Sequence, residues 1–364
     1  MPLESGTFSL SVFEMPAKPA DDVIDAFAAG AAGMLDSVPA DEPQIGWVTG
    51  RHLLETNINE GNGWCGSILH MALRTAKRKL PSSLLNAICR RAELEYMSAN
   101  QTDFVPRAKR KEIKAEMTER WLPKMPPSLS AMPFAWDPVS DMLFVAGVPG
   151  GQMDEFIAMF QKTTGMEPVP WTPETMCRKL MNREYCDLPA FRCGNSSDME
   201  ITPGRDFLTW MWSESEKGSS KLSHPEFGEF ELLVEAPFIF VGSSDSSGAG
   251  ETSVKKGDSP GRSAEVKAAL SVGKKLKKAR LSIARGNQVF SCTMDADRFA
   301  FGGLKLPEGD APDQVSQFEE RMLNCVIFKS AVEAYFKRFA ETLANEPDAL
   351  EKSIGEWIAE RDSL

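Results

Sequence analysis

The sequence has no apolar run long enough to cross a membrane. A transmembrane helix needs about 20 apolar residues, whereas the longest apolar stretch, residues 26–35, is short and contains two glycines. The first basic residue is Lys18, and residues 1–17 lack the apolar core that a signal peptide needs. We therefore expect a soluble, cytoplasmic protein with no membrane partner.

The sequence also lacks any Cys-x-x-Cys pair, and the chain has only three histidines, His52, His70 and His224. A structural zinc site needs about four clustered sulfur or nitrogen ligands, so the sequence predicts no metal and no cofactor. Scattered cysteines are typical of a reducing compartment, where several serve as small apolar core residues. The seven are Cys65, Cys89, Cys177, Cys186, Cys193, Cys292 and Cys325.

Nucleotide-binding motifs are absent or out of context. No G-x-x-x-x-G-K-[ST] loop occurs, and only residues 61–66 (GNGWCG) match G-x-G-x-x-G. A dinucleotide site needs a strand before this pattern and a helix that opens at it. Here a polar turn precedes the pattern and a strand is expected to follow, so a hairpin turn is the better interpretation.

A metal-dependent nuclease needs clustered carboxylates, often with a lysine that positions the attacking water. Asp103 with Glu112 and Lys114 imitates this pattern, and so does Asp258 with Glu265 and Lys267. Both glutamates lie among basic residues on expected helices, where charge pairing at i,i+4 explains them. None of the histidines has a nucleophile motif beside it. We expect no catalytic residues and no enzyme activity.

What the chain does have is an uneven charge distribution. The net charge is −11, which by itself disfavours a nucleic-acid partner. Yet residues 255–285 contain ten basic against two acidic residues, and residues 74–124 contain thirteen against six. The rest of the chain therefore has a net charge of −26. This asymmetry is typical of a protein whose surface repels polyanions except at one basic face.

Hydrophobic periodicity predicts an α+β fold. Residues 315–343 carry an apolar stripe at helical spacing, interrupted by Lys329, which favours a core helix over a dimer seam. Residues 242–261 are rich in Gly and Ser and predict a mobile loop. Helices are expected at residues 21–36, 81–99, 107–120, 152–164, 205–212 and 315–343. Strands or extended segments are expected at residues 7–14, 64–73, 130–137, 141–148, 166–171, 229–241 and 276–306.

Two clusters of cations are the candidate binding residues. Lys274, Lys275, Lys277, Lys278 and Arg280 fall within seven positions without an acidic residue among them. Arg107, Lys109, Arg110, Lys111 and Lys114 follow the break between two expected helices. The alternative is a solvated, lysine-rich face. Few aromatics interleave with either cluster, which favours phosphate contacts with a duplex over base stacking. No helix-turn-helix or zinc-finger pattern indicates sequence readout.

A series of short motifs runs along the chain. In order they are Ile45-Gly46-Trp47-Val48, Lys79-Leu80-Pro81-Ser82, Lys111-Glu112-Ile113-Lys114, Trp121-Leu122-Pro123-Lys124, Ala135-Trp136-Asp137, Pro168-Val169-Pro170 and Gly273-Lys274-Lys275. No single motif is diagnostic, but their order and spacing together are specific. In this order and spacing the chain resembles the RdgC family of recombination-associated DNA-binding proteins.

The resemblance implies a homodimer closed into a ring around double-stranded DNA. Such a protein is nucleoid-associated, binds DNA without sequence preference, and limits RecA-dependent recombination. The subunit would have mixed sheets, a projecting basic helical hairpin and a long C-terminal helix. The family's gate lysines map onto Lys255-Lys256, and Pro126 stands where the family has an interface aromatic. The alternatives are a metal-dependent exonuclease and an acidic protein-interaction module.

Together these patterns predict a division of the chain and a set of DNA-binding residues. Residues 1–83 form the N-terminal α+β part of a central domain, 84–120 a basic finger, and 121–204 a ββαβ unit. Residues 205–344 form a C-terminal domain that contains the 242–261 loop, and 345–364 are a C-terminal extension. The expected DNA-binding residues are Lys77, Arg78, Lys79, Arg107, Lys109, Arg110, Lys111, Lys114, Lys255, Lys256, Lys274, Lys275, Lys277, Lys278 and Arg280.

Overall fold

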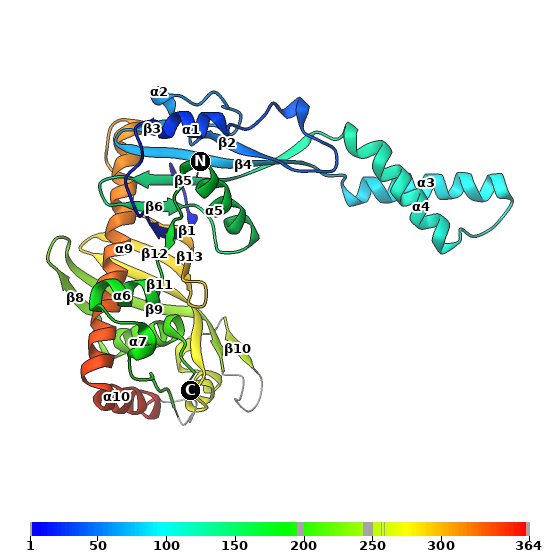
Figure 1. Ribbon diagram of the computed structural model, residues 1–364. Coiled ribbons are helices and arrows are strands. Elements are labelled where there is room, and N and C mark those ends of the chain that lie inside the picture. Colours follow the sequence, from blue (N-terminus) through cyan, green and yellow to red (C-terminus); the bar gives the residue numbers. More distant parts are fainter. Residues whose placement is uncertain (1, 195–199, 243–249, 256, 258, 362–364) are drawn as a thin grey trace. The chain divides into compact units, whose positions relative to one another are not determined.

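The chain forms two compact units, each built from helices and antiparallel strands (Figure 1). The computed structural model describes residues 2–194, 200–242, 250–255, 257 and 259–361. Unit 1 comprises Met1–Pro19, Trp64–Leu69 and Phe134–Leu364, and unit 2 comprises Ala20–Gly63 and His70–Pro133. The prediction of an α+β fold is confirmed.

Unit 1 is organised around an antiparallel sheet in the order β10-β9-β11-β12-β13-β1-β6-β5. Along β9, the residues Phe230, Leu232 and Val234 are buried and their neighbours are exposed, as the two-residue period of a half-covered strand requires. The strands are β10 (Glu251–Val254), β9 (Gly228–Val241), β11 (Lys275–Arg285), β12 (Gln288–Asp295), β13 (Ala300–Lys305), β1 (Phe8–Glu14), β6 (Met142–Val145) and β5 (Pro127–Asp137). Shorter pairings add β8 (Lys221–His224) to β9, β7 (Val169–Pro170) to β1, and β3 (Trp64–Cys65) to the start of β4 (Ile68–Arg78).

The long helix α9 (Gln314–Asn345) packs its apolar stripe into the core of unit 1. Phe318, Phe328 and Phe336 are among its buried side chains, which confirms the core interpretation. Lys329 is buried too, because its Nζ lies 2.6 Å from a carboxylate oxygen of Glu333. The other helices of unit 1 are α5 (Gly151–Thr164), α6 (Pro173–Met181), η3 (Tyr185–Asp187), α7 (Pro203–Lys217), η4 (Pro260–Arg262), α8 (Ala264–Ser271) and α10 (Pro347–Ala359).

The described part of the C-terminal extension, residues 345–361, contributes side chains to the unit 1 core. Helix α10 places Trp357 edge-on against Trp212, with ring centroids 5.0 Å apart. The Arg361 guanidinium lies over both rings, at 4.2 and 4.7 Å. Of the predicted 242–261 loop, residues 243–249, 256 and 258 lie outside the described residues. Its described part includes β10, which pairs with β9, and the first two residues of η4.

Unit 2 contains a two-stranded ladder in which β2 (Gln44–Thr49) pairs with residues 71–76 of β4. The predicted helix over residues 21–36 is wrong in length, because α1 covers only Val23–Ala29. The chain leaves the helix at Gly30, and Ala32 then donates a backbone hydrogen bond of 2.8 Å to Trp47 of β2. A Cβ at Gly30 would lie 2.9 Å from the Trp47 ring, so this close approach needs glycine. Two short helices, η1 (Leu35–Ser37) and α2 (Glu60–Gly63), complete this part.

The remaining helices of unit 2 are α3 (Ser82–Asn100), α4 (Arg107–Trp121) and η2 (Leu122–Lys124). Helices α3 and α4 lie side by side (Figure 1) and share a small core of Ile88, Val105, Ile113 and Met117. Pro81 and Pro106 immediately precede the two helices, where a fixed φ and a missing N–H are tolerated. In the part of the chain that the structure describes, no helix has the length and apolar character needed to cross a membrane.

Candidate nucleic-acid interface

Helix α4 carries three unpaired cations on one face. Its buried residues Ile113 and Met117 point toward α3. Arg107, Lys111 and Lys114 are exposed and recur at i, i+4 and i+7, which places them on a single face. Among the described residues, no carboxylate lies within ion-pair distance of these three side chains. We call Arg107, Lys111 and Lys114 the basic stripe.

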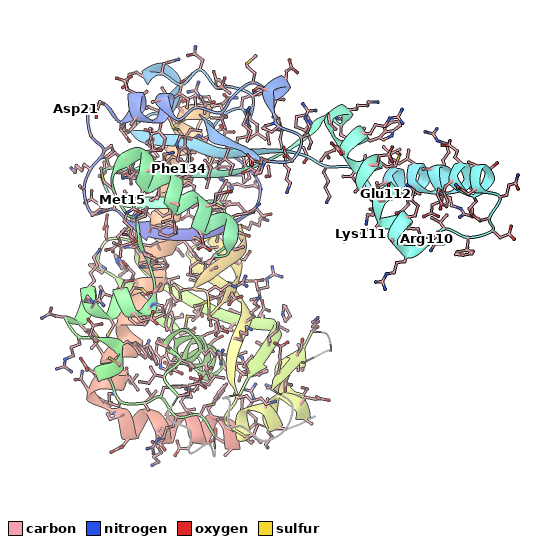
Figure 2. All side chains as sticks on the ribbon, turned by 45° about the vertical axis from the view of Figure 1, so that its right-hand side comes forward. Met15, Asp21, Arg110, Lys111, Glu112 and Phe134 are labelled. Atoms are coloured by element: carbon pink, nitrogen blue, oxygen red, sulfur yellow. The ribbon has the colours of Figure 1, made fainter. Side chains whose placement is uncertain are left out.

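Figure 2 shows Arg110, Lys111 and Glu112 on helix α4. The two cations between Arg107 and Lys111 have partners. Lys109 Nζ lies 2.8 Å from Glu112 Oε1, and this hydrogen bond raises the pKa of Lys109. Arg110 Nε lies 3.8 Å from Glu93 Oε1 on α3. Glu112 is therefore part of an exposed ion pair in this structure, where the nuclease alternative would need it as a metal ligand. Lys109 and Arg110 present less free positive charge than the basic stripe does.

The cations at the end of β4 divide into exposed and structural ones. Lys77 and Lys79 are exposed. Arg78 is half-buried and donates hydrogen bonds to the backbone carbonyls of Val38 (3.0 Å), Pro123 (3.3 Å) and Met125. Arg78 therefore ties β4 to the segment that follows α4, and it positions these elements.

The second predicted cluster, in unit 1, is largely neutralised by acidic residues from elsewhere in the chain. Lys275 Nζ lies 2.6 Å from Asp206 Oδ1. Lys278 Nζ lies 2.8 Å from Asp295, and Lys277 Nζ lies 3.6 Å from Asp297. The sequence places no acidic residue among these lysines, but the fold brings acids to them from α7, from the end of β12 and from the turn after β12.

Lys274 and Lys275 are held inside the fold. Lys274 is buried, and its Nζ donates to Thr252 Oγ1 at 2.9 Å. Asp206, the partner of Lys275, is only 2% exposed. Burial raises the pKa of Asp206, while Lys275 and the hydroxyls of Thr202 and Tyr185 oppose this shift. Both lysines therefore have structural partners, and their assignment as DNA contacts stays a prediction.

The other predicted site residues are less constrained. Arg280 is exposed, and its register partner on β9 is Glu235. Lys255 is exposed, whereas Lys256 and Asp258 lie outside the described residues. The G-x-G-x-x-G pattern ends in a turn at Gly66, which has φ +61° and connects β3 to β4. Among the residues that the structure describes, no group of three or more His, Cys, Asp or Glu side chains is placed to hold a metal ion.

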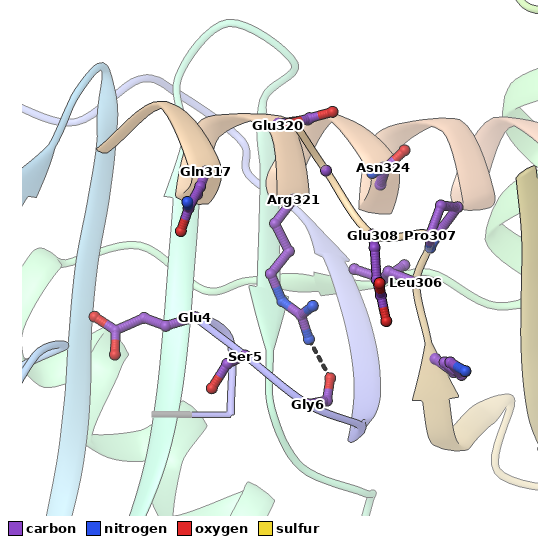
Figure 3. Close-up of a pocket in the computed structure, with 12 residues that line it drawn as sticks. Glu4, Ser5, Gly6, Leu306, Pro307, Glu308, Gln317, Glu320, Arg321 and Asn324 are labelled. Atoms are coloured by element: carbon purple, nitrogen blue, oxygen red, sulfur yellow. Dashed lines mark hydrogen bonds between the residues drawn. The ribbon is translucent and has the colours of Figure 1, made fainter. Parts of the chain in front are cut away.

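A cavity of about 360 Å³ lies in unit 1 between the N-terminal turn, the loop after β13 and the start of α9 (Figure 3). Arg321 crosses it and donates hydrogen bonds to the carbonyls of Gly6 and Pro2. The charged side chains that line it are Arg321 and Lys305 against Glu4, Glu308 and Glu320. Because the carboxylates outnumber the cations, this cavity is a poor phosphate site.

Sequence reasoning missed one exposed side chain beside the basic stripe. Phe104, in the turn between α3 and α4, is 68% exposed. Counting aromatics within each cluster could not find it, because it precedes the first cation. The signal was present in the order Phe104-Val105-Pro106-Arg107, where a proline opens a basic helix directly after two apolar residues.

Comparison with known families adds one finding. A family model described as "RdgC: Putative exonuclease, RdgC" matches residues 22–182. The matched range includes α3, α4 and the basic stripe. No curated protein matches the chain.

Proposed function

We propose that the chain, which matches the RdgC family model over residues 22–182, binds duplex DNA through the phosphate backbone, without sequence preference and without catalysis. The observation that carries this proposal is the basic stripe. Three exposed cations share one face of α4 without acidic partners, in a chain whose net charge is −11. In this acidic protein, carboxylates pair with Lys275, Lys277 and Lys278. The cations of the basic stripe have no such partner among the described residues.

The spacing of the stripe suits phosphates. Lys114 follows Arg107 by seven positions, and a helix rises about 1.5 Å per residue, so the stripe is about 10 Å long. One strand of a duplex presents a phosphate about every 3.4 Å along the axis, so this length covers about three phosphates. Contacts to phosphates position a protein on DNA and carry no direct sequence information.

We expect the affinity for duplex DNA to fall steeply with salt. Each neutralised phosphate contributes a slope of about −0.9 to log K against log salt. The basic stripe with Lys77 and Lys79 provides five exposed cations, which predicts a slope of about −4 or steeper. Fluorescence anisotropy at several salt concentrations measures it, with scrambled duplexes as competitors. A slope near zero, or strong preference for one sequence, would contradict the proposal.

We further propose that two copies close into a DNA-encircling ring associated with the nucleoid, and that this assembly limits RecA-dependent recombination. The resemblance to the RdgC family supports this, and so does the charge distribution, since one acidic subunit offers only a partial basic surface. Light scattering at micromolar concentration is expected to give a dimer. A monomer that binds DNA with full affinity would refute the ring.

The family description makes exonuclease activity the second candidate. Incubation of labelled duplex and single-stranded DNA with the protein, with and without Mg²⁺, separates the two. Retarded but intact DNA in both conditions is expected. Shortening that depends on Mg²⁺ would establish the nuclease, and no retardation would favour an acidic protein-interaction module.

A further inference from the structure

Phe104 is an exposed aromatic residue in the turn between α3 and α4. Helix α3 ends with Gln101 in the left-handed region, at φ 52°. The Thr102 backbone N–H then donates to the Met97 carbonyl at 3.1 Å, and the Thr102 hydroxyl donates to the Phe104 carbonyl at 3.2 Å. These bonds fix the backbone that carries the ring, so its exposure is a property of the folded turn.

The residue after Phe104, Val105, packs into the small apolar core between α3 and α4, whereas Phe104 does not. Val105 is 4% exposed and packs with Ile113 and Met117. Because Val105 precedes Pro106, an extended backbone is favoured there, and consecutive side chains of an extended segment point to opposite sides. Burying Val105 therefore directs Phe104 into solvent, where a large apolar ring gains nothing for stability.

Phe104 is close in sequence to the basic stripe. Arg107, the first cation of the stripe, follows Phe104 by three residues, and α4 then presents Lys111 and Lys114 on the same face. An exposed aromatic ring beside unpaired cations is the combination with which proteins hold single-stranded nucleic acid, because the ring stacks on a base while the cations bind phosphates.

We propose that Phe104 stacks on an unpaired base of DNA, at a single-stranded segment or at an opened duplex end, while the basic stripe holds the adjacent phosphates. This rests on the proposed function and extends it from duplex to unpaired DNA. The faces of paired bases are occupied within the duplex stack, so the ring contributes little to binding of an intact duplex. Asp103, the exposed residue before Phe104, carries a negative charge that repels phosphate.

Full-length protein and the variant Phe104→Ala test this on a single strand labelled with 2-aminopurine and on the matching duplex. We expect the affinity for the single strand to fall about ten-fold, which is within the contribution of one base stacked on an aromatic ring. Affinity for the duplex should stay within about two-fold. Phe104→Trp should retain single-strand affinity, and its added fluorescence should be quenched on binding. Leu94→Ala removes another exposed apolar side chain, 49% exposed on α3, and should change neither affinity.

Several outcomes would overturn the proposal. Equal weakening of both DNA forms by Phe104→Ala, or no weakening of either, would exclude stacking, and so would Phe104→Trp binding as weakly as Phe104→Ala. A smaller assembly of Phe104→Ala in light scattering would assign the ring to contact with a second copy. Wild-type protein that binds neither DNA form would remove the proposed function itself, whereas duplex binding without any Phe104 effect would remove only this inference.

Discussion

The variant Arg107→Glu/Lys111→Glu/Lys114→Glu is expected to bind duplex DNA about a thousand-fold more weakly than the wild type at low salt. Two unit charges about 4 Å apart interact with about 1 kcal/mol in water, and reversal converts that attraction into repulsion at each position. Three reversals, reduced by screening, give a loss of this order. The salt slope should also become less steep by about three units, one for each lost phosphate contact.

The fold should survive these substitutions. All three side chains are exposed and have no acidic partner among the described residues, so no ion pair is broken. Exposed substitutions usually change stability by no more than about 0.5 kcal/mol. Thermal unfolding followed by circular dichroism checks this. We prefer these positions to Lys109 and Arg110 because those two residues have acidic partners, so their reversal would also break ion pairs.

A matched control separates the local effect from the change in net charge. Lys18→Glu/Lys162→Glu/Lys221→Glu also reverses three exposed cations, all of them in unit 1 and without an ion pair among the described residues. We expect its affinity to fall far less and its salt slope to stay unchanged. If both triple variants weaken binding equally, the effect is global electrostatics, and the DNA path lies outside the basic stripe.

The helices that position the stripe could be predicted from the sequence. Pro81 and Pro106 mark the starts of α3 and α4, and Ile88, Ile113 and Met117 fall at helical spacing. These signals are local, and the structure confirms both helices within one or two residues. The long helix α9 was predictable for the same reason, since its apolar stripe continues over many turns.

Interactions between distant segments were not predictable. Helix α1 ends early because β2 brings Trp47 against Gly30, and nothing in residues 21–36 indicates this contact. The pairing of Lys275 with Asp206 joins residues 69 positions apart. A charge count over a window of sequence treats Lys275 and Lys111 alike, although one is in a buried ion pair and the other is exposed and unpaired.

The division into two units could not be predicted either, because each unit combines segments that are far apart in the sequence. Trp64–Leu69 belongs to unit 1, although the segments on both sides of it belong to unit 2. A strand that starts in one unit and continues in the other has no change of composition at the boundary. Segments cut in chain order, such as 1–83 and 84–120, therefore differ from the units that the contacts define.

The variant Lys275→Met is expected to lose about 3–5 kcal/mol of unfolding free energy, because it leaves the buried Asp206 carboxylate without its cation. Urea unfolding measures the loss. Lys277→Met is the matched control, since its partner Asp297 lies 3.6 Å away and both side chains are about a third exposed. A partly exposed ion pair of this kind is worth at most about 1 kcal/mol. Replacing both members by apolar residues, as Lys275→Met/Asp206→Leu, should recover most of the stability.

The loss in Lys275→Met should depend on pH. Burial already raises the pKa of Asp206, and removing Lys275 raises it further. The folded variant then keeps the Asp206 proton at pH values where the unfolded chain, with a pKa of about 3.9, has released it. A folded state that binds more protons loses stability as pH rises, so the deficit relative to wild type should be larger at pH 8 than at pH 5.

The affinity of Lys275→Met for duplex DNA, measured under conditions where the variant is folded, should match that of the wild type. A large loss of affinity with little loss of stability would instead place Lys275 at the DNA interface.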